Sequence, residues 1–319
     1  MCIRDRFNVD GFRFDLMGIH DVETMNAIRQ AMDEVDPRIL LYGEGWDMGT
    51  GLRAEDKAKK DNAYQLPRIG FFNDTERDAV KGAEVYGGIK AGFVSGQATE
   101  DIVAKSILGS SELGSYLSPD QVLNYVEAHD NFNLHDLLAE LHPDDDVLTR
   151  TKRIELATAM NLLMQGMAFM EVGQEFSHTK LVATGEDGQV LHSDRERAMN
   201  SYNAPDIVNQ VNWDILQDHQ ESIDFIKDII RLKTSCKAFS YQIYEDIYKH
   251  VFVQSAEQGS GLIIFEIKDD KHYQVIFNAS GLPYYLPNAD KLRLIVGNSR
   301  HKKPLYVENL TVSVFEVIQ

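Results

Sequence analysis

Three acidic residues stand at the ends of apolar segments of strand length, a position where enzymes often place their reacting groups. Asp15 and Glu44 end two of these segments, and Asp130 follows a third. Two carboxylates in different surroundings are the minimum apparatus for glycoside hydrolysis, because one must donate a proton while the other stays ionised. A single carboxylate at a strand end more often caps a helix or a turn. Three at successive strand ends favour catalysis.

A cation and an imidazole accompany two of these carboxylates. In an extended segment Arg13 and Asp15 lie on the same face, because side chains alternate across a strand. The arginine charge then favours the ionised form of the carboxylate beside it. His129 directly precedes Asp130 and brings a second basic group to the predicted site.

The surroundings of the remaining carboxylate favour a proton donor that faces a sugar. Glu44 stands between Gly43 and Gly45, and Trp46 follows directly. An indole can stack on a sugar ring, and apolar surroundings favour the protonated form that a general acid needs. We therefore interpret Glu44 as the acid and Trp46 as an aromatic contact for the sugar.

Strand-like and helical segments alternate over the first three quarters of the chain. The predicted strands are residues 9–15, 39–44, 68–72, 122–128 and 168–172, and the predicted helices are residues 22–35, 99–108, 147–164 and 217–233. This alternation predicts βα units that form a parallel sheet or barrel. In a βα barrel the catalytic residues lie at the C-terminal ends of the strands, where these carboxylates fall.

The last quarter contains short β-like segments separated by polar turns, which predicts an antiparallel β domain. We divide the chain into an α/β part, residues 7–238, and a C-terminal all-β domain, residues 239–319. Residues 1–6 are charged and offer no partner to the strand-like segment that follows, so we interpret them as a spurious start.

Composition argues against several classes of partner. The 319 residues include 32 basic and 50 acidic side chains, and the net charge of −18 repels nucleic acids and anionic membrane surfaces. No apolar run reaches the length of a membrane span. The two cysteines, Cys2 and Cys236, cannot form a four-ligand zinc site. No other spacing matches a metal motif, so we predict neither a metal nor a cofactor.

Longer stretches around these residues resemble a known family. The second, third and fourth signature regions of the alpha-amylase family of glycoside hydrolases are similar to residues 10–18, 42–46 and 125–131. The exact sequences of these three stretches resemble the type I pullulanases, which are debranching enzymes. The sequences of residues 72–78 and 200–206 resemble them too. The β-rich tail is similar to the C-terminal domain of this family.

The resemblance implies a role for each candidate residue. Asp15 matches the nucleophile, Glu44 the general acid/base, and Asp130 the third carboxylate, which holds the reactive glucose. The implied substrate-binding residues are Arg13, His129, Trp46, Tyr202 and Asn203. The implied reaction is retaining double displacement at α-1,6 branch linkages of pullulan, amylopectin or glycogen-derived dextrins. It requires the Asp15 and Glu44 carboxyl groups to lie about 5–5.5 Å apart.

The resemblance also implies a fold, the C-terminal part of a (β/α)8 TIM barrel (strands four to eight) followed by an antiparallel β-sandwich domain. The first signature region of the family would precede residue 7, so we expect a truncated chain that is unstable or inactive alone. The low cysteine content and the resemblance favour a cytoplasmic location, and secretion stays open because the native start is not seen. Calcium is possible in the family, but no residues here predict a site for it.

Three alternatives remain. An α-1,4-acting amylase or a transglycosidase of the same family is disfavoured by the wording around Asp15 and in residues 200–206. A non-catalytic glucan-binding remnant is disfavoured because all three carboxylates are present. A nucleotide-binding α/β protein is disfavoured because no glycine-rich phosphate loop follows any predicted strand.

Overall fold

A five-stranded parallel sheet forms the first part of the molecule. The structure is a computed structural model that describes residues 6–7, 9–85, 88–299 and 305–318. The strands are β1 (Gly11–Phe14), β2 (Leu40–Gly43), β3 (Gly70–Phe72), β6 (Val122–Asn124) and β7 (Met167–Ala168). They pair in parallel in the order β1-β2-β3-β6-β7. The predicted α/β class, with five barrel strands in chain order, is confirmed.

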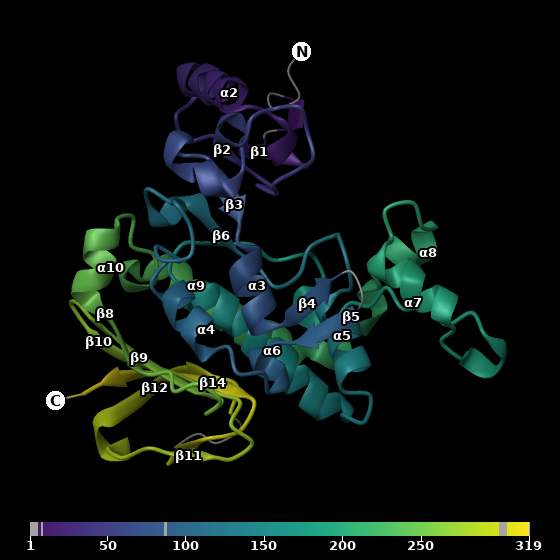
Figure 1. Cartoon of the computed structure of the whole chain (residues 1–319). Helices are drawn as coiled ribbons and strands as arrows, with labels where there is room; N and C mark the ends of the chain where they lie inside the picture. The colour runs from purple at the N-terminus through teal and green to yellow at the C-terminus, as the bar shows by residue number, and fades with distance from the viewer. Residues whose placement is uncertain (1–5, 8, 86–87, 300–304, 319) are drawn as a thin grey trace.

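Helices separate and follow these strands (Figure 1). They are α2 (Val22–Val35), α3 (Asp74–Val80), α4 (Glu100–Ile107), α5 (Leu134–Leu141), α6 (Val147–Leu163), α7 (His192–Met199), α8 (Asp206–Asn209), α9 (Gln220–Ser235) and α10 (Tyr244–His250). The carboxylates of Asp21 and Asp146 accept backbone N–H groups of α2 and α6, which explains where these helices begin. The bounds of α2 agree with the predicted helix 22–35.

The parallel sheet buries two different faces. On one face Phe71 packs with Met25 of α2 in an apolar cluster. On the other face the ring of Phe72 lies 4.9 Å from that of Tyr125, with Tyr42 and Phe169 at 5.8 and 5.3 Å. The guanidinium of Arg13 lies 5.4 Å above the Phe72 ring, which places it on this aromatic face.

The C-terminal part is an antiparallel sandwich, as predicted. Its larger sheet has the order β12-β14-β10-β9-β8. The strands are β8 (Val251–Ser255), β9 (Leu262–Lys268), β10 (His272–Asn278), β12 (Leu292–Gly297) and β14 (Thr311–Val317), and β11 (Tyr284–Tyr285) pairs with β13 (Tyr306–Val307) in a smaller sheet. A hairpin of β4 (Gly82–Val85) and β5 (Gly88–Ala91), which was not predicted, follows α3.

One hydrophobic core joins this sheet to the helices of the first part. Phe265 and Val275 of the sheet belong to the same buried cluster as Leu156 of α6 and Ile229 of α9. The opposite face of the sheet packs against the smaller sheet around Phe315. Helix α10 also lies between residues 239 and 319, so that segment is not composed of strands alone.

The two outer strands of the described parallel sheet are β1 and β7. Leu40, on the neighbouring strand β2, is 52% exposed.

Residues 1–5, which hold most of the predicted spurious start and Cys2, lie outside the described residues. Among the residues that are described, no helix is both long and apolar enough to cross a membrane.

Candidate active site

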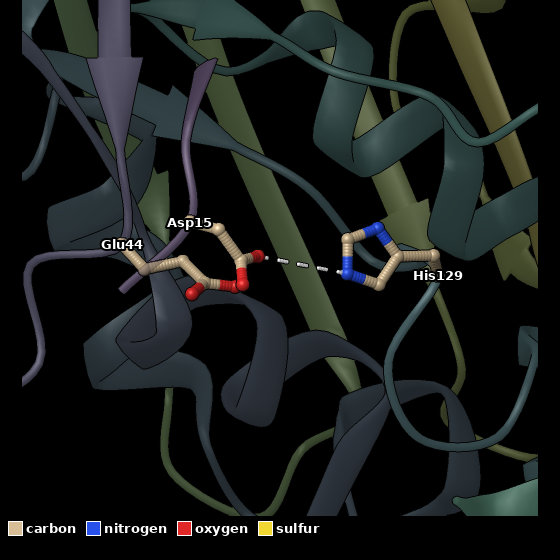
Figure 2. A group of neighbouring side chains, drawn as sticks. All are labelled: Asp15, Glu44 and His129. Atoms are coloured by element: carbon tan, nitrogen blue, oxygen red, sulfur yellow. Dashed lines mark ion pairs between the residues drawn. The ribbon is translucent and has the colours of Figure 1, made fainter. Parts of the chain in front are cut away.

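The predicted catalytic residues meet at the C-terminal end of the parallel sheet. Asp15 follows β1, Glu44 follows β2, and His129 lies in the segment after β6. One ligand atom from each of these three side chains lies within 4.8 Å of the other two. Figure 2 shows the two carboxylates side by side, with the imidazole facing Asp15. Parallel strands bring their C-terminal ends to one edge, which explains why residues far apart in sequence converge here.

Arg13 lies at the centre of this group. Its Nη2 atom is 2.6 Å from Oε1 of Glu44 and 3.1 Å from Oδ1 of Asp15, and its Nη1 atom is 3.2 Å from Nδ1 of His129. Carboxylates and an imidazole at this spacing could by their types hold a metal ion. The guanidinium already provides one positive charge between the two carboxylates, so it offsets part of their negative charge.

Glu44 has polar contacts, and the predicted apolar surroundings are wrong. The side chain is only 9% exposed, and its Oε2 atom accepts the backbone N–H of Leu16 at 2.8 Å. Leu16 adopts a left-handed conformation with φ of 48°, which is uncommon for a residue with a side chain. This turn after β1 and the Arg13 guanidinium hold the two oxygens of Glu44, so the carboxylate is fixed by donors rather than by apolar packing.

Close packing around the segment after β2 requires glycine at two motif positions. A Cβ atom on Gly45 would lie 2.8 Å from the backbone nitrogen of Lys60, and one on Gly18 would lie 1.9 Å from the carbonyl oxygen of Trp46. The motif glycines therefore bring the chain after β1 and the chain after β2 into contact, and this contact sets the position of Glu44 and Trp46.

His129 and Asp130 form a pair at the open side of the cluster. Nε2 of His129 is 3.4 Å from Oδ1 of Asp130 and 3.9 Å from Oδ1 of Asp15. The hydrogen bond to Asp130 raises the pKa of His129, and the same bond lowers the pKa of Asp130. About half of each of these two side chains is exposed. The pair is therefore both ordered and accessible to a ligand.

A small pocket, partly open to solvent, adjoins the cluster. Glu44, Trp46 and Asp130 line it together with Arg13, Phe72, Arg77, Lys81 and Tyr125. Arg77 donates to the Tyr125 hydroxyl at 2.7 Å, and its guanidinium lies 5.8 Å from the Trp46 ring. Arg77 and Tyr125 occur in the motif stretches, but their side chains were not assigned a role from the sequence.

Two predicted substrate-binding residues lie elsewhere. Tyr202 is 81% exposed and Asn203 is also exposed, in the turn between α7 and α8. In Figure 1 these helices project from one side of the molecule. Among the described contacts, none joins either residue to the cluster of Arg13, Asp15 and Glu44. A role for Tyr202 and Asn203 remains a prediction.

Comparison with known proteins identifies the family to which this geometry belongs. No protein-family model matches the chain. Pullulanase from Bacillus subtilis (strain 168) is 35% identical over an alignment of 305 residues, and the match covers 91% of this chain and 40% of that protein. The crystal structure of the pullulanase from Anoxybacillus sp. LM18-11 complexed with maltotetraose superposes with a TM-score of 0.85 at 34% identity. The chain belongs to the pullulanase group of the alpha-amylase family.

The likeness to pullulanases extends over nearly the whole chain. The Anoxybacillus match covers 98% of this chain and 44% of that structure. The pullulanase from Paenibacillus barengoltzii, in complex with maltohexaose and alpha-cyclodextrin, superposes with a TM-score of 0.83 at 34% identity and covers 99% of this chain and 49% of that structure. The chain therefore spans less than half the length of the pullulanases that it matches.

Proposed function

We propose that this chain carries the catalytic residues of a debranching glycoside hydrolase that cleaves α-1,6 linkages in pullulan, amylopectin or glycogen-derived dextrins. The observation that carries the proposal is the convergence of Asp15, Glu44 and His129 around Arg13 at the C-terminal end of the sheet. Similar pullulanase structures hold maltotetraose and maltohexaose, which supports an α-glucan as the ligand.

The reaction begins with two carboxylates that act on opposite ends of one bond. Glu44, in its protonated form, gives its proton to the glycosidic oxygen while an oxygen of Asp15 attacks the anomeric carbon. The bond between that carbon and the glycosidic oxygen breaks, and a covalent glycosyl ester forms on Asp15. Glu44 then takes a proton from water, whose oxygen displaces Asp15. Protons are balanced over the cycle, because Glu44 is protonated again at the end.

The separation of the two carboxylates supports a retaining rather than an inverting reaction. Oxygens of Asp15 and Glu44 lie within 4.8 Å of each other. Inverting glycosidases place their carboxyl groups roughly 6.5–9.5 Å apart to admit a water molecule, whereas retaining enzymes place them about 5–5.5 Å apart. The oxygens of Asp15 and Glu44 lie closer together than the inverting range, so direct attack by Asp15 is the simpler chemistry.

The remaining polar groups bind or orient the substrate. Arg13 contacts both reacting carboxylates and holds Asp15 toward the position of the anomeric carbon. The half-exposed pair of His129 and Asp130 offers a donor and an acceptor to the hydroxyls of the same sugar. Trp46 lines the pocket beside Glu44, where an indole can stack on the leaving sugar.

The test is hydrolysis of pullulan by residues 1–319, with Glu44→Gln as the control. Cleavage of α-1,6 bonds releases maltotriose, whereas cleavage of α-1,4 bonds leaves trisaccharides that still contain an α-1,6 bond. We expect maltotriose in the α-anomeric form, observed by proton NMR before mutarotation. Loss of the acid/base should lower turnover by about 10²–10⁴-fold.

If the chain alone is inactive, the same residues are tested in place of the matching segment of the Bacillus subtilis pullulanase. A folded chimera that releases maltotriose supports the proposal. Products that retain α-1,6 bonds would favour an α-1,4-acting enzyme. Glucan binding without turnover, unchanged in Glu44→Gln, would favour a non-catalytic binding protein and would overturn the assignment.

A further inference from the structure

We propose that two buried lysines, Lys180 and Lys81, are positioning residues that hold the turn carrying His129 and Asp130. A role of this turn in catalysis rests on the proposed function. The hydrogen bonds from the lysines to its backbone can be tested without measuring turnover. The inference comes from the backbone of residues 129–132, which approaches the reacting carboxylates without belonging to a strand or a helix.

The turn lacks the usual backbone support. Strand β6 ends at Asn124, and α5 begins at Leu134. Among the described residues, no backbone–backbone hydrogen bond reaches residues 129–132. Asn131 also adopts a left-handed conformation with φ of 63°. Among the described residues the carbonyl groups of this turn have no main-chain donor, so side chains or water must bind them.

Lys180 provides the main attachment. Its Nζ atom donates to the carbonyl oxygen of His129 at 2.5 Å and to that of Asn131 at 3.1 Å. The residue is 6% exposed, and burial lowers its pKa. A buried ammonium group is costly unless hydrogen bonds compensate for the lost contact with water. The two carbonyls of the turn accept two of its three N–H protons, and the turn is fixed in return.

The segment that carries Lys180 is itself anchored to α5. The backbone N–H of Lys180 donates to Oδ2 of Asp136 at 2.8 Å, and the hydroxyl of Thr179 donates to Oδ1 at 2.5 Å. Nδ2 of Asn133 donates to the carbonyl oxygen of His178 at 3.1 Å. These bonds fix the distance between residues 178–180 and the start of α5, so the Lys180 side chain reaches the turn from a rigid base.

Lys81, which directly follows α3, contacts the same turn more weakly. Its Nζ atom lies 3.4 Å from the carbonyl oxygen of Phe132 and 3.5 Å from Oε1 of Glu84. The residue is 2% exposed, and it lines the pocket beside Glu44. Together the two lysines bind three of the four carbonyl groups of residues 129–132. A loss of Lys180 should therefore loosen the turn more than a loss of Lys81.

The chain offers a matched control for a buried lysine. Lys233 is 8% exposed, and its Nζ atom donates to the carbonyl oxygens of Met164 and Gly166 at 2.6 and 3.0 Å. It resembles Lys180 in burial and in binding two carbonyl groups, but it holds the end of α6. Replacement of Lys233 should reduce stability without altering the turn of His129.

The experiment is an NMR titration of labelled histidine side chains in Lys180→Met, Lys81→Met and Lys233→Met. The His129 resonance is assigned by its loss in His129→Gln. Charged groups that face His129 are Arg13, Asp15, Asp130 and Glu171. When Lys180 is removed, the pair with Asp130 should open, and the His129 midpoint should fall toward the ordinary value of histidine.

The sign of the shift separates geometry from charge. Loss of a nearby positive charge, with the turn unchanged, would raise the His129 midpoint, because protonation would become easier. A fall in Lys180→Met, a smaller fall in Lys81→Met and no change in Lys233→Met support the proposal. An unchanged or raised midpoint in folded Lys180→Met would overturn it. If Lys180→Met does not fold, Lys180→Gln is read by the same criterion.

A chemical rescue tests whether the ammonium group itself is needed. Lys180→Cys treated with 2-bromoethylamine regains an amine of nearly the same length, and the His129 midpoint should return to that of the wild type. Wild-type protein treated in the same way controls for the other thiols. Because no glucan is present, a shift without pullulan cleavage leaves the positioning role intact and counts against the proposed function alone.

Discussion

The end of the parallel sheet that carries Asp15 and the core shared by α6, α9 and the C-terminal sheet are built in opposite ways. In the first region short polar contacts dominate, and Asp15 has a side chain that is 66% exposed. In the second region Phe265, Phe277 and Ile229 are almost fully buried in one apolar cluster. Hydrogen bonds fix directions, whereas burial of apolar area supplies stability.

If the proposed function is right, function and stability reside largely in separate parts of the chain. Catalytic side chains must remain accessible, so they cannot be fixed by packing on all sides. Here Arg13 and the backbone N–H of Leu16 contact the carboxylates, and Lys180 binds the backbone of the turn that carries His129. Substitutions should therefore divide into those that change turnover alone and those that change unfolding alone.

The largest expected effect is loss of Asp15, the proposed nucleophile. Asp15→Asn should lower the turnover of pullulan by on the order of 10⁴-fold or more, the scale seen when a nucleophile is removed from an enzyme. The free energy of unfolding should change by less than about 0.5 kcal/mol, because the side chain is exposed. Initial rates and urea unfolding measure the two effects. A large loss of stability would show that the two regions are not separate.

The opposite result is expected in the shared core. Phe265 is 1% exposed, and its ring lies 5.6 Å from that of Phe277. Phe265→Ala should reduce the free energy of unfolding by about 3–5 kcal/mol, because it leaves a cavity. Tyr285, which is 69% exposed, gives the control Tyr285→Ala. Equal stability of the two variants in urea would contradict the assignment of this core.

A buried acid at the junction of the two regions should make stability depend on pH. Glu76 is fully buried and accepts the backbone N–H of Tyr125, and burial raises its pKa to about 8. The folded state therefore keeps a proton that the unfolded state loses near pH 4.5. Its contribution to stability is complete below pH 4.5 and is lost as the pH rises toward 8.

Glu76→Gln should remove part of this dependence. As the pH is raised from 5 to 8, the melting temperature of the variant should rise relative to that of the wild type. Each kcal/mol of difference in the free energy of unfolding corresponds to about 2–4 °C. Glu112, whose side chain is 66% exposed, gives the control Glu112→Gln, which should not change the pH profile. An equal difference in melting temperature between Glu76→Gln and the wild type at pH 5 and at pH 8 would contradict a role of Glu76 in the pH dependence.

The smallest effect is expected at Tyr202. Its side chain is 81% exposed, so Tyr202→Ala should change the free energy of unfolding by less than about 0.5 kcal/mol. Because none of the described contacts joins Tyr202 to the cluster, Tyr202→Ala should also leave kcat unchanged. A rise in KM for pullulan without a change in kcat would show that the turn between α7 and α8 reaches the substrate, as its motif predicts.

Periodicity predicted the elements better than it predicted their ends. The helix over residues 22–35 was predicted with the bounds of α2, because Asp21 marks its start and apolar residues repeat along it. The strand predicted over residues 122–128 ends at Asn124. Beyond that residue the chain leaves the sheet to carry His129 and Asp130, and local apolar pattern contains no signal for this departure.

The carboxylates of the site could be found from the sequence, but the groups that hold them could not. Asp15 and Glu44 are marked by their place at strand ends and by motif wording. Lys180 contacts a turn about 50 residues earlier, and Arg77 contacts a tyrosine 48 residues later. Such contacts depend on tertiary packing, so neither residue type nor spacing reveals them.

The left-handed backbone of Leu16 has a consequence for how this site can vary. The group that binds Glu44 there is a peptide nitrogen, which every amino acid except proline possesses. Exchange of the leucine side chain can leave this donor in place, provided that the new residue tolerates the same turn. The side chain at position 16 can therefore vary while the backbone donor to Glu44 is kept. Substitution by proline would remove that donor and reveal its role.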